Sequence, residues 1–333
     1  MTARDAAECR SKDQARALWY VAPGLAEIRA APLPARGPDD LLVATCWSAL
    51  SRGTERLVFA GLNDPEHRAT MRAPLQEGDF PFPVKYGYCA VGQVEDGPAD
   101  LLGRHVFVLH PHQDRFLVPA AQASLVPDGV PARRATLAAN METALNGLWD
   151  SGAGAGDRIV VVGAGLVGLL VAALAARLPG AQVTAIDPDP SRAAILAALG
   201  ARWASDGAGI ADADVVFHAS ASGAGLRAAL ACCGPEARLV EMSWYGDRPV
   251  TLGLGGAFHS RRIALVSSQV GSLPPARRPR WDFARRRATA LALLADDRLD
   301  ALVTEELAFD DLPAALGRIL AEGAPGIATV IRY

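Results

Sequence analysis

A glycine-rich hexapeptide is the part of this sequence best suited to do chemistry. Gly163-Ala164-Gly165-Leu166-Val167-Gly168 follows the β-branched run 159–162 and opens a stretch rich in Leu and Ala. In a G-x-G-x-x-G pattern of this kind, the glycines permit a tight turn, a close approach of backbone to a pyrophosphate, and close packing of helix on strand. The amino end of the helix adds N–H donors and a positive dipole. The pattern predicts a dinucleotide site that includes Gly163, Gly165, Leu166, Val167 and Gly168.

An acidic residue after the next predicted strand indicates which dinucleotide would bind. Asp187 ends the strand predicted over 182–187 and stands about as far after Gly168 as the ribose-binding acid of this motif usually does. Its carboxylate would accept hydrogen bonds from the adenosine ribose and repel a 2′-phosphate, which favours NAD(H). The nearby Arg192 keeps NADP(H) open. The remaining alternative is a glycine turn in an α/β domain that binds no cofactor.

The elements around this motif predict an α/β domain with a doubly wound parallel sheet. Continuously apolar strand-like runs alternate with helical stretches, as expected when helices cover both faces of a sheet. The apolar segment 159–178 approaches the length of a membrane span, but its glycines favour a strand, a turn and a helix. The predicted strands are 158–162, 182–187, 202–204, 214–219, 238–242 and 263–269, and the predicted helices are 166–178, 191–199 and 223–233.

The preceding part of the chain has a different pattern. Between residue 17 and about residue 130, short β-prone pieces are separated by turns rich in Pro and Gly, which predicts a small, mostly antiparallel barrel. The pieces are 41–49, 88–94, 105–109 and 116–118. After the sheet we expect a helix near 283–295, a strand near 302–308, a helix near 311–321 and a strand near 326–331.

Composition and charge exclude several classes of partner. The chain has 333 residues, half of them hydrophobic, and a formal net charge of −3, so nothing attracts it to nucleic acid or to an anionic membrane. Its five cysteines lack C-x-x-C spacing, which favours a reducing cytoplasm over a disulfide framework. Residues 1–16 mix acids and bases without the apolar core of a signal peptide and are predicted to be a frayed leader.

Several short motifs are spread along nearly the whole chain. They are Gly53-Thr54-Glu55 with Gly61, Gly87-Tyr88-Cys89-Ala90-Val91-Gly92, Val126-Pro127-Asp128-Gly129, Thr143-Ala144 and Leu199-Gly200-Ala201. With the glycine-rich hexapeptide, they resemble motifs of the medium-chain dehydrogenase/reductase superfamily, the relatives of alcohol dehydrogenase and quinone reductase. This resemblance implies a GroES-like β-rich substrate domain over 1–136 and 275–333, a Rossmann domain over 137–274, a substrate in the cleft between them, and a homodimer.

Departures from the family pattern predict a member without zinc. Zinc-dependent members carry Cys where this chain has Arg52, and His and Glu where it has Tyr88 and Cys89. A catalytic zinc needs about three protein ligands, and an arginine would repel the ion. The four-cysteine lobe of the family's structural zinc is also missing. The stretch 51–55 with Gly87-Tyr88 is similar to zinc-less bacteriochlorophyllide dehydrogenases, which suggests a bulky substrate.

Without a metal, side chains must move the proton. Tyr88 replaces a zinc-binding histidine and could donate its phenolic proton, or it could fill the space that zinc leaves. Thr54 falls where relatives carry a proton-relaying hydroxyl. His112 could act as general acid or base, form a replacement metal site with His110 on one strand face, or be a loop histidine satisfied by hydrogen bonds. Glu142, beside the cofactor candidate Thr143, could orient substrate or partner a helix cap.

Further polar residues could contact ligands. Ser268 and Gln269 end the last predicted sheet strand, where open α/β sheets bind ligands, or they could bond to the following turn. We predict Ser268 near the cofactor and Arg52, His110 and Gln269 near substrate. Six arginines between residues 277 and 287 indicate a solvated helix face, an anion site for a substrate carboxylate or phosphate, or contact with nucleic acid.

Together these observations predict hydride transfer between NAD(H) and an alcohol/carbonyl pair, without zinc. The alternatives are reduction of a conjugated C=C bond, as in zinc-less quinone and enoyl reductases, and a protein that binds NAD(H) as a sensor without turnover.

Overall fold

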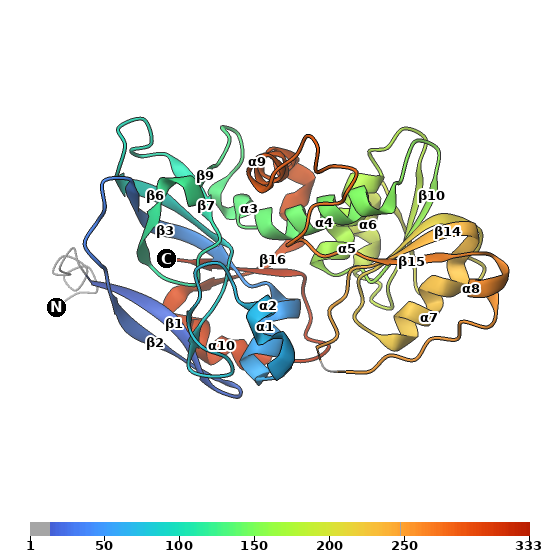
Figure 1. Ribbon diagram of the computed structural model, residues 1–333, viewed down its shortest axis with the longest axis horizontal. Coiled ribbons are helices and arrows are strands. Elements are labelled where there is room, and N and C mark those ends of the chain that lie inside the picture. Colours follow the sequence, from blue (N-terminus) through green and yellow to red (C-terminus); the bar gives the residue numbers. More distant parts are fainter. Residues whose placement is uncertain (1–13, 247) are drawn as a thin grey trace. The chain divides into compact units, whose positions relative to one another are not determined.

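The computed structural model describes residues 14–246 and 248–333 (Figure 1). Cys9 and most of the predicted leader lie outside the described residues. Contacts divide the chain into two compact units, unit 1 formed by Met1–Thr136 with Glu305–Tyr333 and unit 2 formed by Leu137–Thr304. The chain returns to unit 1 later than the predicted residue 275, because helix α9 (Phe283–Leu293) packs against α4 (Ala138–Ser151) within unit 2.

Unit 2 is built on a parallel sheet. Within the described residues its strands follow the order β12-β11-β10-β13-β14-β15, and each neighbouring pair is parallel. The order reverses direction between β10 and β13, which confirms the predicted doubly wound fold. The strands are β10 (Arg158–Val162), β11 (Gln182–Ile186), β12 (Arg202–Ala204), β13 (Ala213–His218), β14 (Cys233–Glu241) and β15 (Ala264–Ser267).

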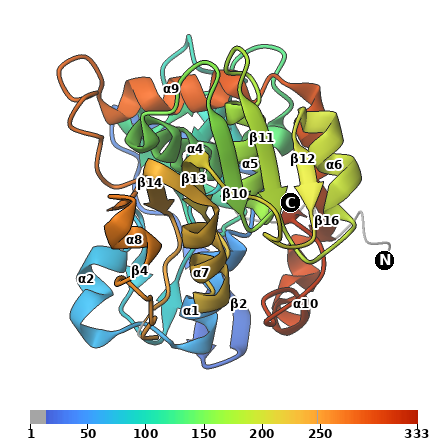
Figure 2. The ribbon, with the colours of Figure 1, turned by 90° about the vertical axis from the view of Figure 1, so that its right-hand side faces the viewer.

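Helices cover both faces of this sheet. Figure 1 shows α4 and α5 on one face and α7 and α8 on the other, and Figure 2 shows the strands of unit 2 from a second direction. Helix α5 is apolar along its whole length because it is buried between the sheet and α4, with which it packs. Besides α4 and α9, the helices of unit 2 within the described residues are α5 (Leu166–Ala175), α6 (Arg192–Leu199), α7 (Gly223–Cys232), α8 (Ala257–Ser260) and the 3-10 helix η3 (Asp297–Leu302).

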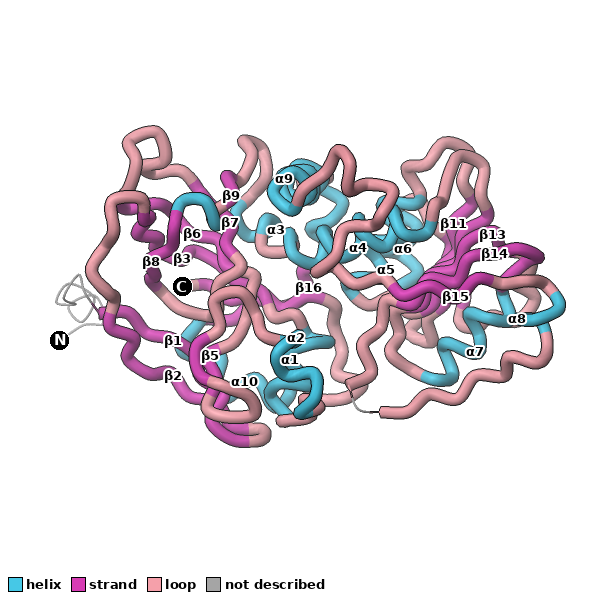
Figure 3. Tube along the Cα trace, in the orientation of Figure 1, coloured by secondary structure: helices cyan, strands magenta, loops and turns pink. Residues whose placement is uncertain are grey.

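Unit 1 contains two mostly antiparallel sheets (Figure 3). One has the order β2-β1-β5-β4, and the other has the order β16-β17-β3-β6-β7-β9, with β8 paired to β3. These sheets agree with the predicted β-rich domain. The strands are β1 (Gln14–Ala22), β2 (Leu25–Pro32), β3 (Asp40–Ala49), β4 (Glu77–Gly78), β5 (Val84–Lys85), β6 (Ala90–Asp96), β7 (His105–Val108), β8 (Arg115–Pro119), β9 (Ser124–Leu125), β16 (Val303–Ala308) and β17 (Ala328–Arg332).

The last segment of the chain completes unit 1. Strand β17 pairs with β3, and α10 (Leu312–Ile319) buries Leu312, Leu316 and Ile319 in the core that also contains Leu18 and Tyr20. The apolar positions of α10 recur at helical spacing, which explains why one face of this helix is buried. The other helices are α1 (Arg52–Ala60), α2 (Arg68–Met71), α3 (Ala132–Ala135), η1 (Pro65–His67), η2 (Ala120–Gln122) and η4 (Phe309–Asp311).

None of the helices within residues 14–246 and 248–333 combines the length and the apolar character needed to cross a membrane.

Candidate functional site

The turn between β10 and α5 can be made only with glycine at two positions. Gly163 has φ +100°, and a Cβ there would lie 2.7 Å from the backbone nitrogen of Ser220. A Cβ at Gly168 would overlap the carbonyl oxygen of Gly163. By contrast, nothing lies within 4 Å of the place where a Cβ of Gly165 would be. The backbone is therefore tightly packed on the protein side and open at Gly165, where α5 begins.

This turn fits a pyrophosphate. Gly165 is the N-cap of α5 and offers no side-chain oxygen to the first-turn N–H groups. Those groups have no partner within a helix, and they carry its positive end. An anion on the open side of Gly165 would satisfy them, which is the arrangement found in dinucleotide sites. The motif residues Leu166 and Val167 form the first turn of α5.

Asp187 holds this turn in place. It follows β11 directly, and its carboxylate accepts hydrogen bonds from the Ala164 N–H at 2.8 Å and from the Asp189 N–H at 2.9 Å. A carboxylate has about four lone-pair positions, so two further bonds to a ribose are compatible with these contacts. Arg192, the first residue of α6, is buried, and its guanidinium pairs with Asp189 at 3.2 Å.

The polar residues predicted beyond β15 make local contacts. Ser268 Oγ donates to the Asp150 carboxylate at 2.7 Å, and the Gln269 side chain accepts from the Gly271 N–H at 2.6 Å. For Gln269 this contact is the predicted alternative of a bond to the following turn. Thr143, inside α4, donates to the Ala139 carbonyl at 3.1 Å.

Glu142 belongs to a buried ion-pair cluster. Its two carboxylate oxygens lie 3.1 Å from Arg286 Nε and 3.1 Å from Arg287 Nε. Arg286 also donates to Asn146 Oδ1 at 2.7 Å and to the Val270 carbonyl at 2.8 Å. Glu142 stands inside α4 and does not partner a helix cap. Its position in the cluster indicates that it joins α4 to α9.

The predicted arginine-rich face is only partly solvated. Arg286 is buried, whereas Arg277, Arg278 and Arg280 are exposed. Arg285 lies over the Trp281 ring at 4.0 Å, and Trp281 packs against Trp149. Cation–π stacking of this kind explains why tryptophan stands among the arginines.

In unit 1, Tyr88 is joined to the start of α1. Its hydroxyl donates to Ser51 Oγ at 2.6 Å. Burial raises the pKa of Tyr88 above its ordinary value, while hydrogen bonds with Ser51 and Thr54 lower it in part. The phenol therefore remains protonated at neutral pH, next to the two hydroxyl groups, and the structure brings Tyr88 and Thr54 together as a polar cluster.

His112 is fully buried and hydrogen-bonded through both ring nitrogens. Nε2 lies 3.1 Å from Glu55 Oε2, and Nδ1 lies 2.8 Å from Ser48 Oγ, which in turn lies 2.9 Å from the Tyr333 hydroxyl. These partners correspond to the predicted alternative of a satisfied histidine, although the histidine lies in the core rather than in a loop. His110 and His112 both follow β7, so the expectation that they share a strand face is wrong; Pro111 between them has no N–H for a strand ladder.

The sequence interpretation did not include Glu55 as a site residue. This carboxylate is 0% exposed and accepts from Tyr20 Oη at 2.7 Å and from the Ser51 N–H at 2.7 Å, in addition to its contact with His112. Burial alone would raise the pKa of Glu55, but His112 and the other donors hold it below its ordinary value. Its place in Gly53-Thr54-Glu55 was the available signal, but its partners are distant in sequence.

The remaining predicted substrate residues also have partners in unit 1. Arg52 donates to the carbonyl groups of Ala324 and Pro325 at 2.8 and 2.9 Å. His110 stacks on Phe116 with ring centroids 3.8 Å apart, and its Nδ1 donates to the Pro111 carbonyl at 2.9 Å. Burial lowers the pKa of His110 to about 3, so its imidazole is neutral at physiological pH.

Two of the three residues at the positions where zinc-dependent dehydrogenases carry ligands do not fit a zinc ion. Arg52 is a cation, Tyr88 is a protonated phenol, and burial raises the pKa of the Cys89 thiol well above its ordinary value. Zinc binds thiolate, imidazole and carboxylate groups, so Arg52 and Tyr88 offer no ligand, and the Cys89 thiol would have to lose its proton to become one. Within the described part of the chain, no three His, Cys, Asp or Glu side chains are grouped so as to hold a metal ion.

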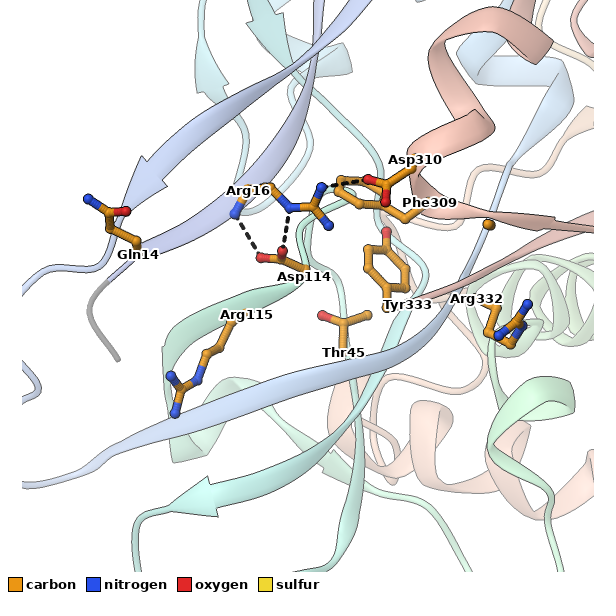
Figure 4. Close-up of a pocket in the computed structure, with 10 residues that line it drawn as sticks. Gln14, Arg16, Thr45, Asp114, Arg115, Phe309, Asp310, Arg332 and Tyr333 are labelled. Carbon is orange, nitrogen blue, oxygen red and sulfur yellow. Dashed lines mark hydrogen bonds and ion pairs between the residues drawn. The ribbon is translucent and has the colours of Figure 1, made fainter. Parts of the chain in front are cut away.

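A pocket of about 360 Å³ with several charged residues in its lining lies elsewhere in unit 1 (Figure 4). Arg16 extends along its wall between Asp114, at 3.1 Å, and Asp310, at 2.5 Å. None of the predicted site residues lines this pocket. Its lining consists of Gln14, Arg16, Thr45, Asp114, Arg115, Ala308, Phe309, Asp310, Arg332 and Tyr333.

Comparison with known proteins supports this fold at low sequence identity. No family model matches the chain. A proposed zinc-binding dehydrogenase from Sinorhizobium meliloti 1021 bound to NADP superposes with a TM-score of 0.76 at 17% identity, over 97% of this chain and 100% of that chain. An alcohol dehydrogenase from Escherichia coli CFT073 complexed with NADH gives 0.75 at 15%, over 96% and 100%. The 2R,3R-butanediol dehydrogenase of Bacillus subtilis gives 0.76 at 17%, over 96% and 99%. At these identities the likeness establishes the shared fold.

Proposed function

We propose that this protein is an NAD(H)-dependent oxidoreductase that interconverts an alcohol and a carbonyl compound without zinc. The observation that carries the proposal is the turn at Gly163 and Gly168, which admits only glycine and leaves the amino end of α5 open at Gly165. Structures with the same fold have been solved with NADP and with NADH, and one of them is a butanediol dehydrogenase. These neighbours support a nicotinamide cofactor and an alcohol substrate.

The preference for NAD(H) over NADP(H) is supported by charge. Asp187 places a carboxylate beside the turn, and its two bonds to backbone N–H groups keep it there. A 2′-phosphate would be repelled by this carboxylate. Arg192, which would be the attractive partner of such a phosphate, is buried and paired with Asp189.

Zinc independence is supported by Arg52, which is a cation, by Tyr88, which is a protonated phenol, and by the raised pKa of the Cys89 thiol. In this proposal the bound cofactor supplies the hydride, and a side chain moves the proton. Tyr88 is the proposed donor, since its protonated phenol is already oriented by Ser51 and Thr54. The resemblance to enzymes of bulky ring substrates and the homodimer remain predictions.

Cofactor titration tests whether the glycine turn before α5 binds a nicotinamide dinucleotide. NADH binding, followed by fluorescence, should be saturable and tighter than NADPH binding. Gly165→Ala serves as the matched variant: nothing within 4 Å obstructs its methyl group, so the fold should persist while the methyl occupies the space that the pyrophosphate needs. Equal NADH affinity in the two proteins would contradict the proposed site.

Turnover and metal content test the rest. NADH absorbance should change with at least one member of a panel of alcohols, ketones and enones, in protein that contains no stoichiometric zinc by elemental analysis. Activity confined to enones would favour the C=C reductase. Tight NADH binding with no turnover would favour the sensor, and stoichiometric zinc would overturn zinc independence.

A further inference from the structure

A serine, a histidine and a glutamate are hydrogen-bonded in line at the carboxyl edge of the sheet in unit 2. His218 ends β13 and Glu241 ends β14, and the two residues are paired in register. His218 Nδ1 lies 2.8 Å from Glu241 Oε2, and His218 Nε2 lies 2.7 Å from Ser220 Oγ. The imidazole is fully buried, and the serine is partly exposed. The imidazole is therefore buried between a partly exposed hydroxyl and a carboxylate that is also partly exposed.

The carboxylate is held in its ionised form. The Ser243 N–H donates to Glu241 Oε1 at 2.7 Å, and the Tyr245 hydroxyl donates to Oε2 at 3.0 Å. Burial opposes the charge, but these donors and His218 hold the pKa of Glu241 below its ordinary value. An ionised carboxylate only accepts hydrogen bonds, so Nδ1 must carry a proton. When the imidazole is neutral, Nε2 is a bare acceptor for the proton of the serine hydroxyl.

The backbone brings the serine hydroxyl to an exposed turn before a helix. Ser220 lies between β13 and α7, and Ala221 after it has a left-handed φ of +51°. The Ser222 side chain caps α7 by accepting from the Gly225 N–H at 3.0 Å. The first N–H groups of α7 and its positive end point toward this turn. A strand, a serine turn and a helix in succession resemble the layout that exposes nucleophiles in other α/β proteins.

The turn also lies where open parallel sheets bind ligands. Strand order reverses between β10 and β13, and the backbone nitrogen of Ser220 lies so close to Gly163 that a side chain there would collide with it. Ligands of doubly wound sheets bind at such a reversal. A small electrophile at this edge would be within reach of the hydroxyl.

We propose that Ser220, His218 and Glu241 form a nucleophile, base and orienting acid that make Ser220 an acyl acceptor for small activated carboxylic esters. Ser220 Oγ forms a bond to the ester carbonyl carbon, and its proton passes to His218 Nε2. The bond from that carbon to the leaving oxygen breaks, and the proton moves from Nε2 to the departing alkoxide. Water then attacks the acyl carbon while His218 takes its proton. The bond from this carbon to Ser220 Oγ breaks, the proton passes from His218 to Ser220 Oγ, and the carboxylic acid leaves.

If His218 and Glu241 had only a structural role, they would not need Ser220. Their contact already joins the ends of β13 and β14, and any hydrogen-bond donor could satisfy His218 Nε2 in place of the serine hydroxyl. The third member is a partly exposed hydroxyl 2.7 Å from the base, which is the distance required for proton transfer. The acyl transfer uses no cofactor, but Ser220 adjoins Gly163 of the proposed dinucleotide turn, so labelling is measured without added nucleotide and does not depend on NAD(H) binding.

A fluorophosphonate probe tests the proposal on the full-length protein. The probe forms a stable bond with an activated serine hydroxyl and expels fluoride, and intact mass with peptide mapping locates the adduct. We expect one adduct on Ser220 in the parent protein and none in Ser220→Ala. Ser260→Ala is the matched control, because Ser260 is an exposed serine that donates to the Gly256 carbonyl; it should be labelled like the parent.

The base and the acid are tested by rate. Labelling should slow about 100-fold or more in His218→Gln, and the pH at which it reaches half its maximal rate should shift in Glu241→Gln, which a merely structural role would not produce. Tyr245→Phe removes one donor to the carboxylate and should have a smaller effect. Circular dichroism shows whether each variant folds. No adduct on Ser220 in the folded parent, or equal labelling of a folded Glu241→Gln variant across pH, would overturn the proposal.

Discussion

Replacing Arg286 by methionine should destabilise unit 2 strongly. The guanidinium is buried and joins three acceptors from two segments: Glu142 and Asn146 of α4, and the carbonyl of Val270 after β15. Methionine has a similar length but no donor. Glu142 and Asn146 would remain buried without this donor, and the Glu142 carboxylate would lose its fully buried counter-charge.

The structure allows the size of this effect to be worked out. The side chains of Arg286 and Glu142 are each 4% exposed, and breaking such a buried pair costs about 3–5 kcal/mol. Glu142 keeps its second partner, Arg287, so the lower end of that range applies. For a unit of this size, about 3 kcal/mol corresponds to a fall in Tm of roughly 6–12 °C.

Thermal and urea unfolding measure the loss, and a double-mutant cycle separates the pair from its surroundings. Glu142→Gln combined with Arg286→Met should cost at least about 1 kcal/mol less than the sum of the single changes, because the double variant leaves no unpaired buried charge. Arg278→Met is the control. Arg278 is exposed, so its removal should change stability by no more than about 0.5 kcal/mol.

A cost below about 1 kcal/mol for Arg286→Met, with unchanged cooperativity of unfolding, would refute this account. It would mean that the cluster is hydrated, and that Glu142 is available for other chemistry.

Three further predictions concern the turn, acid stability and the buried network. Gly168→Ala should abolish measurable NADH binding by fluorescence and lower the Tm, because its methyl group overlaps the Gly163 carbonyl; a variant with parental affinity would contradict this. The folded-state pKa of His110 is about 3 and its ordinary value about 6.5, so the unfolded state binds more protons between these values and stability falls as pH drops through this window, by up to about 1.4 kcal/mol per pH unit. His110→Gln should flatten that slope in urea titrations from pH 6.5 to 4, and an unchanged slope would show that other groups cause it. The pKa of Glu55 is lower in the folded protein than in the unfolded chain, so this group stabilises the fold above its unfolded pKa, and the gain is lost as pH falls through its folded pKa. Glu55→Gln should remove this stabilisation, so the free energy of chemical unfolding should fall more at pH 7 than at pH 4.

The fold was predictable where its signals are local. The apolar strand β10, the glycine turn and helix α5 lie within one short stretch of sequence. The strand predicted over 202–204 is β12. Strand and domain boundaries that depend on tertiary contacts were harder to predict from the sequence. The strand predicted over 238–242 is the end of β14, which begins at Cys233, and the return to unit 1 follows α9, whose partners on α4 cannot be seen in a local pattern.

The candidate site was predictable only in part, for the same reason. The role of Gly168 depends on Gly163, its neighbour in sequence, whereas the close contact of Gly163 is with the distant Ser220. The partners of His112 and Glu142 come from distant segments, and spacing along the chain contains no information about them. The alignment of His218 with Glu241 arises from the register of two parallel strands, which the sequence pattern does not determine.

The composition of unit 1 from two pieces of chain imposes an order on biosynthesis. Unit 2 is one continuous stretch, so it can fold as soon as it leaves the ribosome. Unit 1 must wait, because β17 and α10 are translated after unit 2 and supply a strand partner of β3 and part of the core. During that interval an unpaired strand edge and apolar side chains are exposed, which is the condition that recruits chaperones or leads to aggregation.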